Sequence, residues 1–164
     1  MTEPRVLPLR ARKGDWLFIL AFGFFTWSSW FSDIVPALGI PMTKDSPNPL
    51  ARANFFYADG ADPLLLANPI YLRVSTFISA FGFGAFYPIL VWAFATGRNA
   101  IRIPAICYVA AMTYGMVFFL SMEFLGPLPP TNLPWFFVWN LPYLFVPLAL
   151  GYRMRRAHPF SACI

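Results

Sequence analysis

Charged residues, cysteine and histidine are all scarce in this sequence. Asp, Glu, Lys and Arg make up 12% of the chain, and there are two cysteines and one histidine. The cysteines, Cys107 in an apolar run and Cys163 beside the end, are too few for a disulfide framework or a thiolate metal site. The single histidine, His158, lies in the basic C-terminal segment, which argues against histidine-ligated metals and histidine-based acid–base catalysis. We therefore expect no metal ion and no other cofactor.

Hydrophobic residues dominate what remains. They make up 59% of the 164 residues, and the 19 phenylalanines and 6 tryptophans are too many to stay in contact with water. The net charge of +5 does not indicate a nucleic-acid partner, because the basic residues flank the apolar runs instead of forming a stripe on one soluble face. A lipid bilayer is therefore the expected solvent.

Four apolar runs predict the fold. They cover residues 16–38, 70–96, 103–125 and 133–152. Each is close to the ~20 residues that a helix needs to cross ~30 Å of hydrocarbon. Buried helices of a soluble bundle would need polar faces, which these runs lack. We therefore predict an all-α bundle of four transmembrane helices, with a membrane domain at 16–152 between basic tails at 1–15 and 153–164.

The basic residues also predict the orientation of the helices. Nine lysines and arginines lie before the first run, between the second and third, or after the last, whereas the opposite side carries only Lys44 and Arg52. The positive-inside rule then places both termini in the cytosol and the long first loop, residues 39–69, in the lumen or exterior. Within that loop, residues 49–57 are predicted to form a short interfacial helix. The pattern suits the endoplasmic reticulum of a eukaryote or the inner membrane of a bacterium.

Two acidic residues within the runs are candidates for a functional site. An acid near the centre of a transmembrane helix costs about 2.5–3.5 kcal/mol, so Asp33 and Glu123 each need a partner or a wet cavity. Both lie in the predicted non-cytosolic half. Asn140 lies about 10 Å deep on the same side, with Tyr143 one turn further in, which predicts one polar pocket. The alternative is that these polar side chains only hydrogen-bond neighbouring helices together.

Prolines and aromatic residues favour a cavity around this pocket. Pro88, Pro142 and Pro147 each remove a backbone hydrogen bond, so their helices are expected to bend outward. Aromatic side chains, Trp30 and Tyr114 among them, would then wall a site for a flat apolar molecule. Packing of the same rings without any ligand is the alternative.

Asp62, in the long first loop, adds a third acid to the predicted site. Two carboxyl groups brought together in a low dielectric cannot both stay ionised, so we expect Asp33 and Asp62 to share a proton. Such a pair would hold an amine or hydroxyl group, or would act as an acid toward an alkene. The predicted ligand-binding residues are Asp33, Asp62, Trp30, Ser79, Tyr114, Glu123, Asn140 and Tyr143.

Four segments give the chain a resemblance to a known family. They are FSD (31–33), ADPLLLANP (61–69), GRNAIRIPAICY (97–108) and NLPYLFVP (140–147). In order and spacing they resemble the EXPERA family, which includes the emopamil-binding protein sterol isomerases and the sigma-2 receptor. The resemblance implies a site for sterols or cationic amphiphiles.

The resemblance also implies roles for individual residues. Asp33 and Asp62 match acids that recognise cationic amphiphiles in the receptor. Asn140, Tyr143 and Glu123 match ligand-facing or acidic positions of the isomerases. The chain departs from the family at Ser79, which stands near the position of a glutamate in the second helix, and the histidine one turn earlier is absent.

Three functions follow from these observations. The first is a membrane protein that binds a sterol, another lipid-like molecule or a cationic amphiphile. The second is a sterol double-bond isomerase or related lipid-modifying enzyme, with Asp33, Asp62 or Glu123 as the catalytic acid or base. The third is a non-catalytic subunit of a larger membrane complex, and a homodimer is also compatible with the sequence.

Overall fold

Four long apolar helices build the molecule. The computed structural model describes residues 5–162. Its long helical stretches are Asp15–Ala37, Ile70–Thr96, Asn99–Leu125 and Leu133–Arg153, each long and apolar enough to cross a membrane. The all-α, four-span fold class predicted from hydropathy is therefore confirmed.

Three of the four long helices are interrupted. The first consists of α1 (Asp15–Ser28), the π-helical η2 (Ser29–Asp33) and α2 (Ile34–Ala37). The second consists of α5 (Ile70–Phe77), the π-helical η3 (Ile78–Phe83) and α6 (Gly84–Thr96). The fourth breaks at Leu141, between α8 (Leu133–Asn140) and α9 (Pro142–Arg153). The third, α7 (Arg102–Leu125), is continuous and follows the short 3-10 helix η4 (Asn99–Ile101).

Only one of the three interruptions coincides with a proline. Pro142 is the first residue of α9, directly after the break in the fourth helix. Pro88 and Pro147 lie inside α6 and α9, which continue through them. The two π-helical segments contain no proline, and no pattern in the sequence predicted them.

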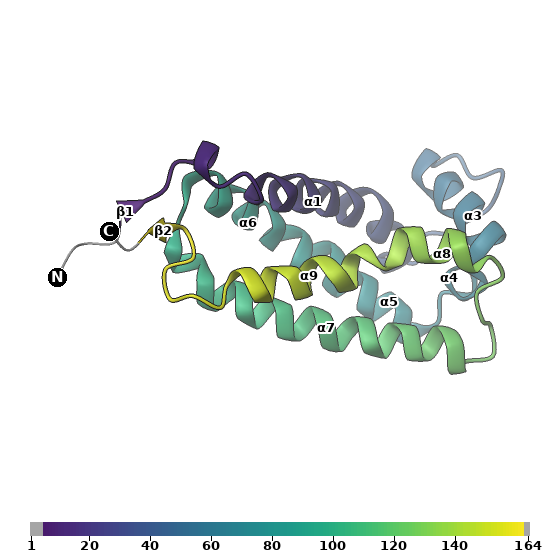
Figure 1. Cartoon of the computed structure of the whole chain (residues 1–164). Coiled ribbons are helices and arrows are strands. Elements are labelled where there is room, and N and C mark those ends of the chain that lie inside the picture. The colour runs from purple at the N-terminus through teal and green to yellow at the C-terminus, as the bar shows by residue number, and fades with distance from the viewer. Residues whose placement is uncertain (1–4, 163–164) are drawn as a thin grey trace.

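The helices pack as an elongated bundle (Figure 1). α1 lies along α6, α7 lies along α9, and α2 lies along α5. Both described ends of the chain lie at one end of the bundle, and α3, α4 and α8 lie at the other. The core between the helices is largely aromatic, and its fully buried members include Phe22, Tyr87 and Phe94.

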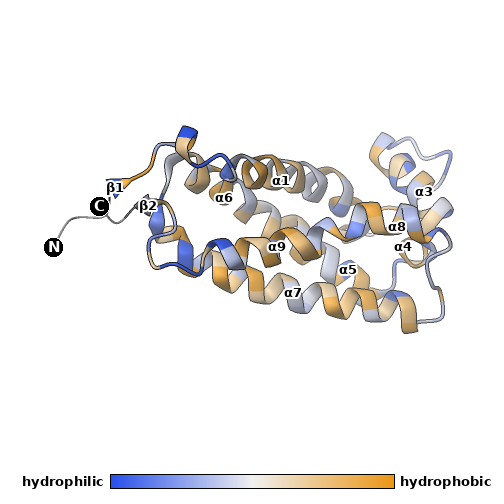
Figure 2. Cartoon of the chain, in the orientation of Figure 1, coloured by the Kyte–Doolittle hydropathy of each residue, from blue (hydrophilic) through white to orange (hydrophobic). Residues whose placement is uncertain are grey.

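The outer surface of the bundle is apolar. Figure 2 shows hydrophobic residues along the long helices and hydrophilic residues gathered mainly at the two ends. Leu17 is 71% exposed, Ile70 72% and Leu125 86%. An apolar surface of this extent suits acyl chains better than water, so the structure supports the expected membrane environment.

The first loop folds over the end of the bundle away from the termini. It forms α3 (Pro49–Ala61) and α4 (Pro63–Ala67). Asn48 caps α3 by accepting hydrogen bonds from the backbone N–H groups of Leu50 and Ala51. A stripe of small residues along α3 is buried, so this face of the helix packs against the protein; the stripe comprises Ala51, Asn54, Ala58 and Ala61. The predicted interfacial position of this helix stays a prediction.

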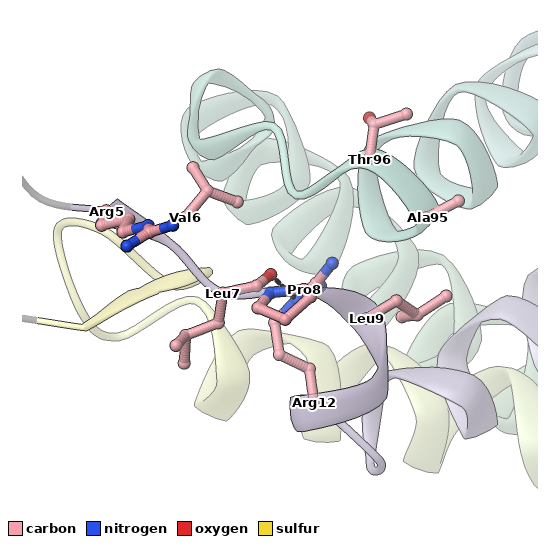
Figure 3. Close-up of a pocket in the computed structure, with 8 residues that line it drawn as sticks. All are labelled: Arg5, Val6, Leu7, Pro8, Leu9, Arg12, Ala95 and Thr96. Carbon is pink, nitrogen blue, oxygen red and sulfur yellow. Dashed lines mark hydrogen bonds between the residues drawn. The ribbon is translucent and has the colours of Figure 1, made fainter.

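The two tails pack together at the opposite end. Strand β1 (Arg5–Val6) pairs antiparallel with β2 (Ser161–Ala162), and the 3-10 helix η1 (Leu9–Ala11) follows β1. Figure 3 shows the Arg12 side chain, which donates a hydrogen bond to the backbone oxygen of Leu7. Arg12 also forms an ion pair with Asp15. Asp15 also pairs with Arg153, and the fully buried ring of Phe160 lies against both guanidinium groups. This buried ion network ties the N- and C-terminal segments to α1 and α9.

Candidate functional site

Asp33 lies where the two π-helical segments meet. It is the last residue of η2, and its carboxylate accepts a hydrogen bond of 2.6 Å from the Ser79 hydroxyl in η3. The hydroxyls of Ser29 and Ser79 are 3.5 Å apart, so three polar side chains form one cluster between two apolar helices. Short π-helical insertions occur frequently at functional sites. The π turns therefore present an acid and its hydroxyl partners inside the bundle.

A glycine lets the two helices approach closely beside this cluster. A Cβ atom on Gly84 would lie 2.9 Å from the Trp30 indole nitrogen and 3.2 Å from the Ser29 Cβ. Only a residue without a side chain fits there. Gly84 thus sets the distance at which Ser29 and Trp30 pack against α6, and the Trp30 ring remains half-exposed.

Tyr143 borders the same region from the fourth helix. Its ring stacks on Phe25, with the ring centroids 4.1 Å apart. Its hydroxyl oxygen is buried and lies near the charge of Asp33. Asp33, Ser79 and Tyr143, which the sequence predicted as ligand-binding residues, therefore come from three different long helices to one place.

Asp62 occupies the junction between α3 and α4. Its side chain caps α4 by accepting a 3.0 Å hydrogen bond from the Leu65 backbone N–H, and Pro63 follows as the first helical residue. The residue is only 3% exposed. This burial raises the pKa of Asp62 to about 6, while the hydrogen bond from Leu65 acts in the opposite direction. The carboxyl group therefore changes protonation just below neutral pH.

Glu123 is the most unusual acid of the molecule. It lies near the end of α7, is 0% exposed, and neither carboxyl oxygen has a hydrogen-bond partner among residues 5–162. Its charge is close enough to that of Asp62 for the two to repel each other. A buried polar group without a partner costs about 1–3 kcal/mol, and more when it is charged. Glu123 is thus a site at which a proton or a donor group from another molecule would stabilise the protein.

Tyr57 and Asn140 join α3 to the fourth helix beside these two acids. The Asn140 amide donates to the Tyr57 hydroxyl and to the Phe136 backbone oxygen, both at 2.9 Å. Burial raises the pKa of Tyr57, and the negative charges of Asp62 and Glu123 raise it further, while the hydrogen bond from Asn140 lowers it. The Tyr57 hydroxyl therefore stays protonated, under the influence of both carboxyl groups.

The predicted polar residues thus form two groups instead of one acid pair. We call Asp33, Ser29, Ser79 and Tyr143 the π cluster, and Asp62, Glu123, Tyr57 and Asn140 the loop cluster. Each of Asp33 and Asp62 has its own donor, from η3 and from α4 respectively. The expected sharing of one proton by Asp33 and Asp62 stays a prediction.

Two of the three predicted aromatic ligand-binding residues, Trp30 and Tyr114, lie at the periphery. Trp30 adjoins the π cluster through Gly84, but Tyr114 is 76% exposed on the outer surface of α7. Ser29 and Tyr57 were not among the site residues predicted from the sequence. The stripe of small residues along α3 would have shown that this helix packs against protein, and hence that Tyr57, next to the stripe, is close to the core.

The ionisable side chains of residues 5–162 are not grouped as the ligands of a metal ion are. Within residues 5–162, no group of three or more His, Cys, Asp or Glu side chains is placed to hold a metal ion. The chemistry of the two clusters is therefore that of carboxyl, hydroxyl and amide groups, which donate and accept protons and hydrogen bonds.

Comparison with known proteins adds one finding. The family model described as EBP: EXPERA (EXPanded EBP superfamily) matches residues 49–154. The match covers more than half of the chain and includes the whole loop cluster and Ser79 and Tyr143 of the π cluster, whereas Asp33 lies before it. The search of curated proteins found no match.

Proposed function

Because the chain belongs to the EXPERA family, we propose that it binds a sterol-like or other lipid-like molecule within the half of its membrane domain that lies opposite the termini. The π cluster and the loop cluster supply the polar contacts at that end. The helices around them are apolar and partly aromatic, which suits a rigid hydrocarbon skeleton.

The unpartnered carboxyl group of Glu123 is the observation that carries this proposal. Its two oxygens are acceptors that no described residue satisfies, and Asp62 beside it carries the same charge. A ligand that fits must therefore bring a hydrogen-bond donor or a positive charge. A hydroxyl group on a sterol and the ammonium group of a cationic amphiphile both meet this requirement.

Apolar contact supplies affinity, and the acids supply selectivity. Burying several hundred Å² of a ring system contributes of the order of 10 kcal/mol at about 25 cal/mol per Å². Lipid tails already solvate the free ligand, so most of that gain is offset. Discrimination between the ligand and bulk lipid then rests on ring shape and on the donor group that reaches Glu123.

The proposed topology places both clusters in the non-cytosolic half of the bilayer. The excess of lysine and arginine at the end with the termini supports this orientation. The membrane itself would be the endoplasmic reticulum in a eukaryote or the inner membrane in a bacterium.

Native mass spectrometry of the purified full-length protein with added cholesterol tests the binding proposal. We expect a sterol adduct for the wild type and a decrease in affinity of about tenfold or more for Glu123→Leu, because a hydrogen bond to a charged group contributes about 1.5–3 kcal/mol. Asp59→Asn removes a carboxylate from the exposed face of the nearby α3 and is the matched control. Equal adduct levels in the wild type and the Glu123 variant would contradict the proposal.

The proximity of Asp62 and Glu123 favours a second candidate, a double-bond isomerase. One protonated carboxyl group would give its proton to an alkene carbon of the sterol ring, forming a carbocation. A carboxylate would then remove a proton from a neighbouring carbon, and a new double bond would form there, so that atoms and charge balance. Two buried carboxyl groups of like charge beside one another are suited to hold one proton between them.

Deuterium incorporation separates an isomerase from a binding protein. The protein is incubated in D2O with a sterol that carries one ring double bond, and the product is analysed by mass spectrometry. An isomerase yields a shifted double bond and a mass gain of about one unit, because the added proton comes from solvent-exchanged carboxyl groups. A bound but unchanged sterol would exclude turnover of that sterol and leave the binding proposal standing.

A further inference from the structure

A hollow of about 380 Å³ lies at the end of the bundle that carries the termini, far from both acid clusters. It lies between the N-terminal segment and the C-terminal residues that follow α9. Four basic side chains and one acidic one line it, which gives its lining a net charge of +3; they are Arg12, Lys13, Arg153, Arg156 and Asp15.

The basic side chains of this hollow are of two kinds. Arg12 and Arg153 are held in place by Asp15, at 2.5 Å and 2.8 Å respectively. Lys13 and Arg156 are exposed, and the side chain of neither makes a hydrogen bond or ion pair with another residue of the 5–162 range. The buried ion network therefore builds a rigid, positively charged wall, and two further cations are free to engage a ligand.

The position of the hollow matches the headgroup region of a bilayer. Lys13 lies two residues before α1 begins at Asp15, and Arg156 lies three residues after α9 ends at Arg153. On the membrane side of Lys13, α1 presents exposed apolar side chains, with Trp16 50% and Leu17 71% exposed. Tryptophan is typical of the membrane interface, and leucine of the acyl-chain region.

We propose that this hollow binds the phosphate-bearing headgroup of an anionic phospholipid, with the acyl chains lying along α1. Lys13 and Arg156 contact the phosphate, and the wall formed by Arg12 and Arg153 excludes cationic groups. Electrostatic attraction between basic side chains and anionic lipids is strongest where the side chains meet the interface, as they do here. The site is independent of the sterol-like ligand proposed above.

Native mass spectrometry of the full-length protein tests the proposal with two lipids of identical acyl chains, phosphatidylglycerol and phosphatidylcholine. We expect the wild type to retain phosphatidylglycerol in preference. In the double variant Lys13→Gln/Arg156→Gln we expect the affinity for phosphatidylglycerol to fall by about 25-fold, which is about fivefold for each basic side chain removed. The control Lys44→Gln/Arg52→Gln removes two exposed cations at the other end of the bundle and should retain the lipid.

Two further measurements keep the result unambiguous. The charge-preserving variant Lys13→Arg/Arg156→Lys should bind as the wild type does, which separates lost charge from lost folding. Addition of ~10 mM inorganic phosphate should leave the lipid adduct in place, because a free anion lacks the acyl chains that Leu17 contacts. Any of three results would overturn the proposal. The control variant would lose as much phosphatidylglycerol as the double variant, the wild type would retain phosphatidylcholine equally well, or phosphate would displace the lipid.

Discussion

Asp62 caps a helix, belongs to the candidate site and makes folding stability depend on pH. Its carboxylate caps α4 through the Leu65 N–H, yet its burial raises its pKa from 3.8 to about 6. A carboxyl group whose pKa is higher in the folded than in the unfolded protein favours folding below the unfolded pKa, and this contribution is lost as pH rises through the folded pKa. Folding stability attributable to Asp62 therefore declines between about pH 4 and pH 6.

The variant Asp62→Asn measures this effect. Asparagine keeps the side-chain oxygen that accepts from Leu65 but cannot ionise, so the cap remains and the pH dependence disappears. Between pH 4 and pH 7 we expect the free energy of unfolding of the variant to increase by about 3 kcal/mol relative to that of the wild type, since each unit of pKa shift corresponds to ~1.4 kcal/mol. Thermal unfolding in detergent at several pH values provides the comparison. Parallel curves for the two proteins would show that the Asp62 carboxyl is not desolvated.

Candidate residues could be predicted from the sequence, but their grouping could not. An acid inside an apolar run is unusual enough to identify Asp33 and Glu123 directly. Which acids meet depends on how α3 and α4 fold back over the bundle, and these contacts join residues far apart in the chain. Tyr57 belongs to the loop cluster through its hydrogen bond with Asn140. The two residues are 83 positions apart in the chain, and nothing in the sequence indicates that they meet.

Hydropathy predicted where the long helices begin and end, but it did not predict the interruptions within them. The first helix begins at Asp15 and the second covers Ile70–Thr96, close to the runs in the sequence. The π-helical segments η2 and η3 have no composition of their own, because the extra residue is accommodated by packing between the helices and not by local propensity. Both lie where Asp33 meets Ser79, so the irregular backbone and the polar cluster belong to one feature.

The contact between η2 and α6 is close at Gly84, so a side chain added there should disturb it. In Gly84→Ala the new Cβ would lie 2.9 Å from the Trp30 ring and 3.2 Å from Ser29, so η2 and α6 would have to separate. Overpacking of this kind costs about 1–3 kcal/mol. We expect a lower unfolding temperature and weaker sterol binding, because Ser29 and Asp33 share η2.

Gly115→Ala in α7 is the matched control for this substitution. No atom lies within 4 Å of the Cβ that it would add, so the change should stabilise the helix by up to about 1 kcal/mol through the better helix propensity of alanine. Thermal unfolding of the two variants in the same detergent tests the contrast. A stability loss of the same size in both would mean that the close approach of η2 to α6 is not the cause.

The molecule as a whole has two chemically different ends. One end holds the buried carboxyl groups of the loop cluster, and the other holds the ion network around Asp15 and the cationic hollow. The bundle separates them by the length of its helices (Figure 1). The proposed orientation, with the basic end in the cytosol, would place this end against the anionic cytoplasmic leaflet of a bilayer.

Labelling of single cysteines tests this orientation directly. In a background with Cys107→Ser and Cys163→Ser, the variants Lys44→Cys and His158→Cys place one thiol at each end of the bundle, both at exposed positions. We expect a membrane-impermeant maleimide to label Lys44→Cys in intact bacterial spheroplasts, and His158→Cys only after lysis, because the positive-inside rule retains the arginine-rich end in the cytosol. The reverse pattern would put the cationic hollow against the outer leaflet and remove the electrostatic reason for an anionic lipid there. It would leave the contacts of Asp33 and Glu123 unchanged, so the two ends of the molecule can be judged separately.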